Sequence, residues 1–261
     1  MKATGWPATA VVLWSLSLVL ASSRVATPKG LSAPAFSGPK LVAVREVFSA
    51  PTPYGDITGE GVSDAEVAAY RRFFDPEWRR YPPAVLRLSG LREVRFCREL
   101  AFAGQRRAAV PDFERDVLYL DVERGRHSPT YLRKVIHHEL FHVLDWKDDG
   151  RLYEDPLWAA LNPPGFRYGN GGVNAQNDAG GSVLRHDLPG FLTTYSLAGV
   201  EEDKAEVFAH LMLDPEVVEE RSRRDPVLRA KAQRIRLLLW RAAPELGAEF
   251  WACGRLRERE G

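Results

Sequence analysis

Residues 135–145 read Val-Ile-His-His-Glu-Leu-Phe-His-Val-Leu-Asp and contain His138, Glu139 and His142 in the order H-E-x-x-H. An α-helix places side chains four residues apart on one face, so the two imidazole rings can bind one metal ion. The carboxylate of Glu139 would then lie beside that ion, where it can act as a general base. The motif therefore predicts a zinc hydrolase, provided that the rest of the chain supplies a third ligand.

The residues around the motif favour a helix that begins near Ser128. Ser128 can cap the first turn, and Pro129 suits the first helical position because its missing N–H would have no partner there. Apolar side chains recur at helical spacing from Leu132 to Leu144. The helix thus has one face to bury and one face for chemistry.

Length and charge limit the classes of protein to consider. The 261 residues can form one large domain or two modest ones with a real core. Lys and Arg number 36 against 35 Asp and Glu, so charge gives no case for nucleic acid or an anionic membrane surface as partner. For a zinc hydrolase outside the cytosol, the simplest substrate to expect is a peptide or protein.

The first residues have the pattern of an export signal. Lys2 supplies a positive charge, residues 10–20 are mostly apolar, and small residues follow at 21–23. The apolar run is shorter than the roughly 20 residues that cross a bilayer, so no stable membrane span is expected, and a retained anchor is the alternative. Residues 1–23 are therefore predicted to be a signal peptide of a secreted or extracytoplasmic protein.

Export also changes how the two cysteines, Cys97 and Cys253, are interpreted. In an oxidising compartment they can form a disulfide, and two cysteines allow one pairing. A buried free thiol at each position is the alternative.

The remaining chain divides by composition. Proline and glycine are frequent in residues 24–60, which predicts a linker or pro-segment with one short strand at 41–47. Residues 61–261 are predicted to form a single zincin-like domain. A capping pattern begins a helix at Ser63, and further helices are expected from residue 200, at 215–222 and at 226–243.

Two strands are predicted before the motif, at 91–103 and 116–122, from alternating apolar side chains. The fold class is therefore α+β: a small mixed sheet beside an active-site helix, followed by a mainly helical C-terminal part. The strand at 116–122 could present backbone groups to an extended peptide, and a plain core strand is the alternative.

The third metal ligand is expected on the helix that follows residue 200. Glu202 and Glu206 are four residues apart, so one can bind the metal while the other accepts a hydrogen bond from a ligand histidine. Asp148 competes because it comes six residues after His142, although that geometry usually has a glycine where Asp145 stands. His137 and His186 are interpreted as surface histidines.

The two segments together resemble the catalytic domain of anthrax lethal factor and the related secreted proline-specific endopeptidases, which are gluzincin-type zinc metallopeptidases. The resemblance covers about residues 128–213 and no multidomain extension, so it implies no toxin role. In that family an aspartate follows H-E-x-x-H by three residues, and a tyrosine precedes the ligand glutamate by seven. The matching positions in this chain are Asp145, Tyr195, Glu201, Glu202, Ala205, Glu206 and Phe208.

The resemblance implies a role for each matching site residue. His138, His142 and Glu202 would bind Zn²⁺, Glu139 would act as general base, and Tyr195 would donate to the developing oxyanion, while Glu206 and Asp145 would support the ligands from behind. The predicted function is a secreted endopeptidase that hydrolyses peptide bonds with a zinc-activated water. The alternatives are a metal-binding or structural protein without turnover, and a metallohydrolase that acts on cell-wall peptide amides.

Overall fold

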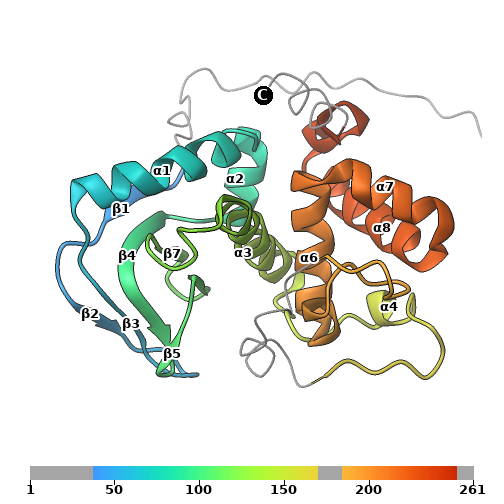
Figure 1. The fold of residues 1–261 in the computed structure, drawn as a ribbon, viewed down its shortest axis with the longest axis horizontal. Helices are drawn as coiled ribbons and strands as arrows, with labels where there is room; N and C mark the ends of the chain where they lie inside the picture. The colour runs from blue at the N-terminus through green and yellow to red at the C-terminus, as the bar shows by residue number, and fades with distance from the viewer. Residues whose placement is uncertain (1–37, 170–183, 252–261) are drawn as a thin grey trace, which may run out of the picture. The chain divides into compact units, whose positions relative to one another are not determined.

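The structure is a computed structural model that describes residues 38–169 and 184–251 (Figure 1). The predicted signal peptide and the first part of the predicted linker lie outside the described residues. So does Cys253, and with it the predicted disulfide; Cys97 itself is buried in a strand. Within the described ranges, no helix combines the length and the apolar character that crossing a membrane requires.

A seven-stranded mixed sheet forms one side of the fold, with the strand order β2-β3-β4-β7-β6 and with β1 and β5 also paired to β4. β1 and β7 run parallel to the first half of β4, and the other pairs are antiparallel. The strands are β1 (Lys40–Ala43), β2 (Phe48–Ala50), β3 (Ile57–Glu60), β4 (Glu93–Phe102), β5 (Gln105–Arg106), β6 (Ala109–Asp112) and β7 (Val117–Asp121).

The sheet includes residues that the sequence assigns to a linker or pro-segment. β1, β2 and β3 all lie between residues 40 and 60, so this half of the 24–60 segment is part of the folded domain. Pro51 and Pro53 lie in the connection between β2 and β3, and Gly59 lies in β3 where a Cβ would meet the Phe48 ring at 2.7 Å. Proline and glycine here mark the turns and close contacts of short strands, not a tether.

Helices make up the rest of the described chain, which is therefore α+β as predicted. Ser63 and Glu66 form the predicted capping box at the start of α1, and the helices expected after residue 200 are present. The bounds are α1 (Asp64–Trp78), α2 (Pro83–Ser89), α3 (Pro129–Asp149), α4 (Pro156–Ala159), α6 (Val200–Leu213), α7 (Pro215–Arg224) and α8 (Pro226–Ala242), with 3₁₀ turns η1 (Tyr195–Leu197) and η2 (Pro244–Leu246).

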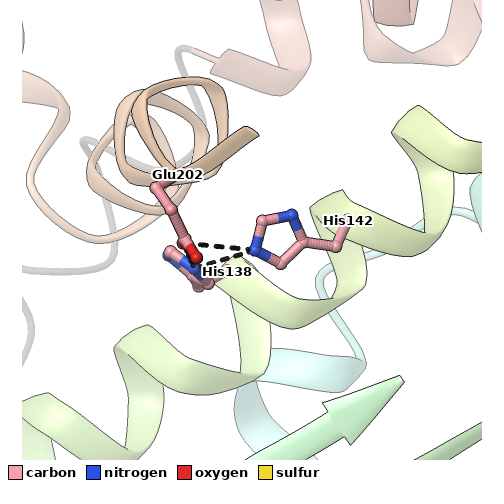
Figure 2. Close-up of side chains that lie close together, drawn as sticks. All are labelled: His138, His142 and Glu202. Carbon is pink, nitrogen blue, oxygen red and sulfur yellow. Dashed lines mark hydrogen bonds and ion pairs between the residues drawn. The ribbon is translucent and has the colours of Figure 1, made fainter. Parts of the chain in front are cut away.

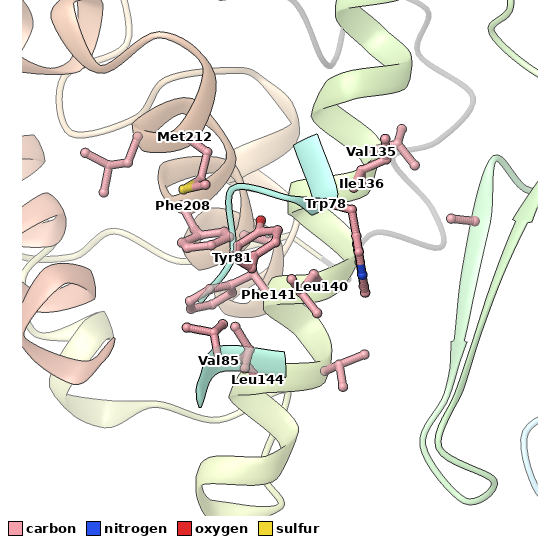
Figure 3. Close-up of a cluster of buried hydrophobic side chains, with 14 of the residues drawn as sticks. Trp78, Tyr81, Val85, Val135, Ile136, Leu140, Phe141, Leu144, Phe208 and Met212 are labelled. Atoms are coloured by element: carbon pink, nitrogen blue, oxygen red, sulfur yellow. The ribbon is translucent and has the colours of Figure 1, made fainter. Parts of the chain in front are cut away.

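α3 lies between the sheet and α6 (Figure 1). Its apolar side chains Ile136, Leu140 and Phe141 are buried, and the Phe141 ring packs 5.0 Å from the ring of Phe208 on α6 (Figure 3). Full burial of such a side chain stabilises the fold by about 1.5–3 kcal/mol. This packing holds α3 and α6 together, and these two helices carry the predicted ligands.

Candidate metal centre

The helix that carries the H-E-x-x-H motif has the start that the sequence predicts. The side chain of Ser128 accepts a hydrogen bond from the backbone N–H of Tyr131, and Pro129 opens the first turn. The helix ends at Gly150, whose φ of 72° is a left-handed conformation that glycine adopts without strain. His138 and His142 thus project from one face of a continuous helix, one turn apart.

The third side chain comes from α6, which is buried along its whole length. Figure 2 shows Glu202 extending from α6 toward His138 and His142 on α3. The Nε2 atom of His138 lies 2.9 Å from Oε2 of Glu202 and 3.0 Å from Nε2 of His142. The third side of this triangle, from His142 Nε2 to Glu202 Oε2, is 3.4 Å. Three donor atoms therefore converge on one point.

This triangle fits a zinc ion. Zinc binds imidazole nitrogen at about 2.0–2.1 Å in a tetrahedron, so two ligand atoms lie about 3.3 Å apart. Two histidines and one carboxylate also form a donor set that leaves a fourth position open, as catalytic zinc sites do. His138, His142 and Glu202 are the group of buried side chains within the described residues that could hold a metal ion.

The charges around His138 also suit a cation. Burial alone would lower the pKa of His138, but hydrogen bonds to Glu202 and Glu206 outweigh burial and raise this pKa to about 10. Burial would raise the pKa of Glu202, yet His138 and His142 hold it well below its usual range. The carboxylates therefore stabilise positive charge at this point, which a proton or a metal ion bound to neutral histidine can supply.

Glu206 supports the other side of the His138 ring. Its Oε1 atom lies 3.0 Å from Nδ1 of His138 and accepts a hydrogen bond of 2.9 Å from Nζ of Lys134. Its Oε2 atom accepts a hydrogen bond of 2.8 Å from the hydroxyl of Thr193. A carboxylate held in this way fixes the orientation and tautomer of the ligand ring. Glu206 thus occupies the supporting position, and Glu202 the position beside both histidines.

Glu139 and Tyr195 lie at the same centre. The Tyr195 hydroxyl, in the 3₁₀ turn η1, donates a hydrogen bond of 2.9 Å to Oε1 of Glu202. Glu139 faces the cavity that also contains the two histidines, and burial raises the pKa of its carboxyl group although both histidines lower it. A carboxylate with a raised pKa is better suited to accept a proton near neutral pH.

Asp145 contacts a buried lysine on α6, whereas Asp148 lies on the surface. Asp148 is exposed and outside the metal-binding group. The Oδ1 atom of Asp145 accepts a hydrogen bond of 2.8 Å from the buried Nζ of Lys204 on α6, so Asp145 joins α3 to α6. The Nδ1 atom of His142 is buried and has no hydrogen-bond partner within residues 38–169 and 184–251.

Comparison with known proteins gives one distant structural likeness. No protein-family model matches the chain, and no curated protein matches it significantly. A solved structure from Bacteroides caccae, described as a proposed zinc-binding metallo-peptidase, is similar with a TM-score of 0.45 and 16% sequence identity. The likeness covers 72% of this chain and 74% of that one. At this level it assigns neither an activity nor a ligand, which must come from the side chains described above.

A cavity of about 970 Å³ opens over His138, His142 and Glu202. Strand β6 lies along one wall, and the chain after α3, including Tyr153 and Glu154, lies along another. The predicted strand at 116–122 corresponds to β7, which is buried at every position and lies between β4 and β6. β7 is therefore a plain core strand and not the edge that could hold a peptide. The strand at the sheet edge beside the cavity is β6.

Several residues of the centre have only a weak signal in the sequence. Lys134 stands four residues before His138 on the same helix face, and this spacing is its only signal. Thr193 and Lys204 have none, because their partners are 13 and 59 residues away. His186 is exposed as predicted, but the interpretation of His137 as a surface residue is wrong. His137 is fully buried, and its Nε2 atom lies 2.8 Å from a carboxylate oxygen of Glu77 on α1, so the buried ring has a polar partner there.

Proposed function

We propose that the protein is a zinc-dependent endopeptidase. The observation that carries this proposal is the convergence of His138 Nε2, His142 Nε2 and Glu202 Oε2 within 2.9–3.4 Å of one another at the floor of a large cavity. Glu139 faces the same cavity, so a general base stands beside the donor set. Two histidines, a third carboxylate ligand and a base are the groups that metal-assisted hydrolysis of an amide requires.

The residues of this chain have distinct parts in the proposed reaction. A zinc ion held by His138, His142 and Glu202 would supply Lewis acidity toward water and toward the scissile carbonyl. Glu139 takes the proton from the attacking water and delivers it to the leaving amine. Tyr195 donates its single O–H to the carboxylate of Glu202 in this structure, and we assign the same O–H to the oxyanion when substrate is bound, in place of its bond to Glu202.

The edge of β6 supports a peptide as substrate. The N–H of Asp121 donates to the carbonyl of Ala108 at 2.8 Å, and the register continues through Ala109 opposite Leu120. Because hydrogen-bonded pairs alternate along an antiparallel ladder, the backbone groups of Ala109 and Pro111 point away from β7. Pro111 has no N–H. Within the described residues no further strand pairs with β6, so this edge offers the N–H and C=O of Ala109 and the C=O of Pro111 to an extended chain.

The site of action rests on the sequence alone. The signal-like residues 1–23 support a secreted or extracytoplasmic enzyme that acts on peptides or proteins outside the cytosol. A metallohydrolase that cleaves cell-wall peptide amides would use the same centre and is the second candidate activity. Digestion of a mixed peptide library beside isolated cell-wall peptides distinguishes these substrates by which of them is cleaved.

Metal content and hydrolysis together test the proposal. The purified wild type is expected to hold one zinc ion per chain, Glu202→Ala to lose it, and Asp148→Ala to keep it. Glu139→Gln should keep zinc and lose peptide hydrolysis, because it removes the base and leaves the ligands. Zinc retention by Glu202→Ala with loss from Asp148→Ala would overturn the ligand assignment. Zinc binding by the wild type with no hydrolysis of any peptide would favour a metal-binding protein without turnover.

A further inference from the structure

One cation in the wall of the cavity, Arg107, has no ion-pair partner among the residues that the structure describes. Arg107 lies between β5 and β6, is 6% exposed and lines the cavity that contains His138 and Glu139. One guanidinium nitrogen, Nη2, donates a hydrogen bond of 2.9 Å to the side-chain oxygen of Gln105, which is uncharged. The other, Nη1, is buried and has no hydrogen-bond partner within the described parts of the chain.

The other buried cations of the described chain all face carboxylates. Lys134 pairs with Glu206, Lys204 with Asp145 and Lys231 with Asp203. Buried charges in proteins are generally paired in this way, since an unpaired one loses its hydration without compensation. Arg107 forms no ion pair within residues 38–169 and 184–251. Burial accordingly lowers the pKa of its guanidinium group.

Arg107 lines the cavity beside the edge strand along which a peptide is proposed to lie. Arg107 precedes the edge strand by two residues and lies on the same side of the chain as Ala109, whose side chain packs with the α3 side of the core. Tyr195, Glu139 and Glu202 are the groups that favour its charge. Glu202 is engaged with both histidines, and Glu139 is the proposed base. Neither is a hydrogen-bonded counter-ion of Arg107.

We propose that Arg107 binds a carboxylate group of the substrate and so determines specificity in the cleft. This inference rests on the proposed peptidase function. The carboxylate is either the C-terminal group of a peptide or an acidic side chain within it, and a guanidinium fork recognises both in the same way. Among the described residues that line the cavity, Arg107 is the one lysine or arginine. Glu114, Glu154 and Glu201 add negative charge elsewhere on the cavity wall. Apart from the metal position, Arg107 is therefore the point on this wall that attracts a substrate carboxylate, and this contact would fix where the peptide lies.

Binding measurements on a variant that does not cleave its ligand test this inference. In a Glu139→Gln background, calorimetry compares short alanine-rich peptides with a free C-terminal carboxylate and the same peptides with a C-terminal amide. A second pair replaces an internal glutamate with glutamine. In one of the two pairs, the additional change Arg107→Gln is expected to weaken binding of the peptide that carries the carboxylate about 10- to 100-fold. The amide and glutamine peptides should change little, and the pair that responds identifies which carboxylate is bound.

A neighbouring arginine provides the matched control. Arg106→Gln removes the same charge one residue away, but Arg106 is exposed and paired with Glu99, so it should leave all four affinities unchanged. Arg107→Lys keeps the charge without the fork and covers the case in which Arg107→Gln does not fold. It should also weaken binding of the carboxylate peptide selectively.

Several results would overturn the inference. One is that the Glu139→Gln protein with Arg107 intact binds the carboxylate peptide no more tightly than its uncharged counterpart in both peptide pairs. Another is an equal loss for charged and uncharged peptides, especially with a lower melting temperature, which would assign Arg107 a structural role or a role in balancing Glu139. Failure of the proposed function has a different signature: hydrolysis that persists in Glu139→Gln, or absence of zinc, with the selective effect of Arg107 on binding intact.

Discussion

Nδ1 of His138 lies 3.0 Å from Oε1 of Glu206, so this imidazole is held by a carboxylate on each side of its ring. Glu206 is in turn held by Lys134 on α3 and Thr193 before η1. The result is a chain of contacts from a lysine through a carboxylate to the proposed ligand. The orientation of His138 therefore depends on residues that do not touch the metal position.

Replacement of Glu206 by glutamine should weaken metal binding without removing a ligand. Glu206→Gln keeps the shape of the side chain but loses the negative charge that faces His138 and Lys134. Loss of such a supporting group typically lowers metal affinity about 10- to 100-fold. Competition with a chelator of known zinc affinity measures the effect, and Glu216→Gln, an exposed position on α7, is the control. Unchanged affinity in Glu206→Gln would show that the contact does not orient the ligand.

Tyr195→Phe should separate catalysis from metal binding. The substitution removes the hydroxyl that donates to Oε1 of Glu202 and leaves the ring in place. We expect kcat to fall about 10- to 100-fold because a donor near the reacting carbonyl is lost, while zinc content stays at the wild-type level. Steady-state kinetics with metal analysis of the same preparation checks this. A variant that loses zinc but, once reloaded, cleaves at the wild-type rate would show that Tyr195 only positions Glu202.

The buried pair behind Glu202 should matter for stability more than for chemistry. Nζ of Lys231 on α8 lies 2.7 Å from Oδ2 of Asp203, and both side chains are fully buried. Lys231→Met leaves the Asp203 carboxylate buried with its hydrogen bonds from Trp158 and Tyr168 alone. Breaking a buried pair from one side costs about 3–5 kcal/mol of folding free energy.

Urea denaturation of Lys231→Met measures this cost. Arg229→Met on the exposed side of α8 is the control, and it should change the free energy of unfolding by less than about 0.5 kcal/mol. The double variant Lys231→Met with Asp203→Asn should recover part of the loss, because no unpaired charge remains. Equal stabilities of the single variant and the wild type would contradict the importance of this pair.

Stability should also depend on pH through Glu77, which lies behind the metal-binding helix. Burial alone would raise the pKa of Glu77, but hydrogen bonds from His137, Arg80 and Arg133 lower it to about 2. Because this pKa is below the ordinary glutamate value of about 4.5, the charged carboxylate stabilises the fold above about pH 5. That contribution, about 3 kcal/mol, is lost as the pH falls from about 4.5 toward 2.

Metal-free protein is the right material for this measurement, because acid also releases bound metal. The free energy of unfolding from pH 6 to pH 2 should fall less steeply in Glu77→Gln than in the wild type. Asp75→Asn, two residues earlier on α1, should keep the wild-type slope. Identical slopes for Glu77→Gln and the wild type would mean that Glu77 titrates alike in the folded and unfolded states.

The sequence predicts the helical parts of this centre well because short-range rules govern them. A serine cap, a proline in the first turn and a spacing of four residues place His138 and His142 on one face of α3. The same spacing places Glu202 and Glu206 on α6. The structure adds which carboxylate faces which nitrogen, and that depends on how α3 and α6 pack.

The sequence signal fails where partners are distant or strands are short. β1, β2 and β3 have three or four residues each, too few for an alternating pattern to stand out among prolines and glycines. His137 shows the other case, because its burial depends on Glu77, which is 60 residues away. Arg107 has no local signal in the sequence, because its burial in the cavity wall without a carboxylate partner among the described residues becomes visible only in the folded chain.

The complete burial of α6 has a consequence for anyone who wishes to redesign this protein. Glu202, Asp203, Lys204 and Glu206 each face a different partner on another segment. A shift of α6 by one residue in either direction would place an uncharged side chain or one of the wrong charge at the positions of Lys204 and Glu206. The helix has one permitted register. New substrate preferences would therefore have to be introduced at the exposed rim of the cavity, for example at Tyr54 and Tyr153, whose side chains are largely exposed.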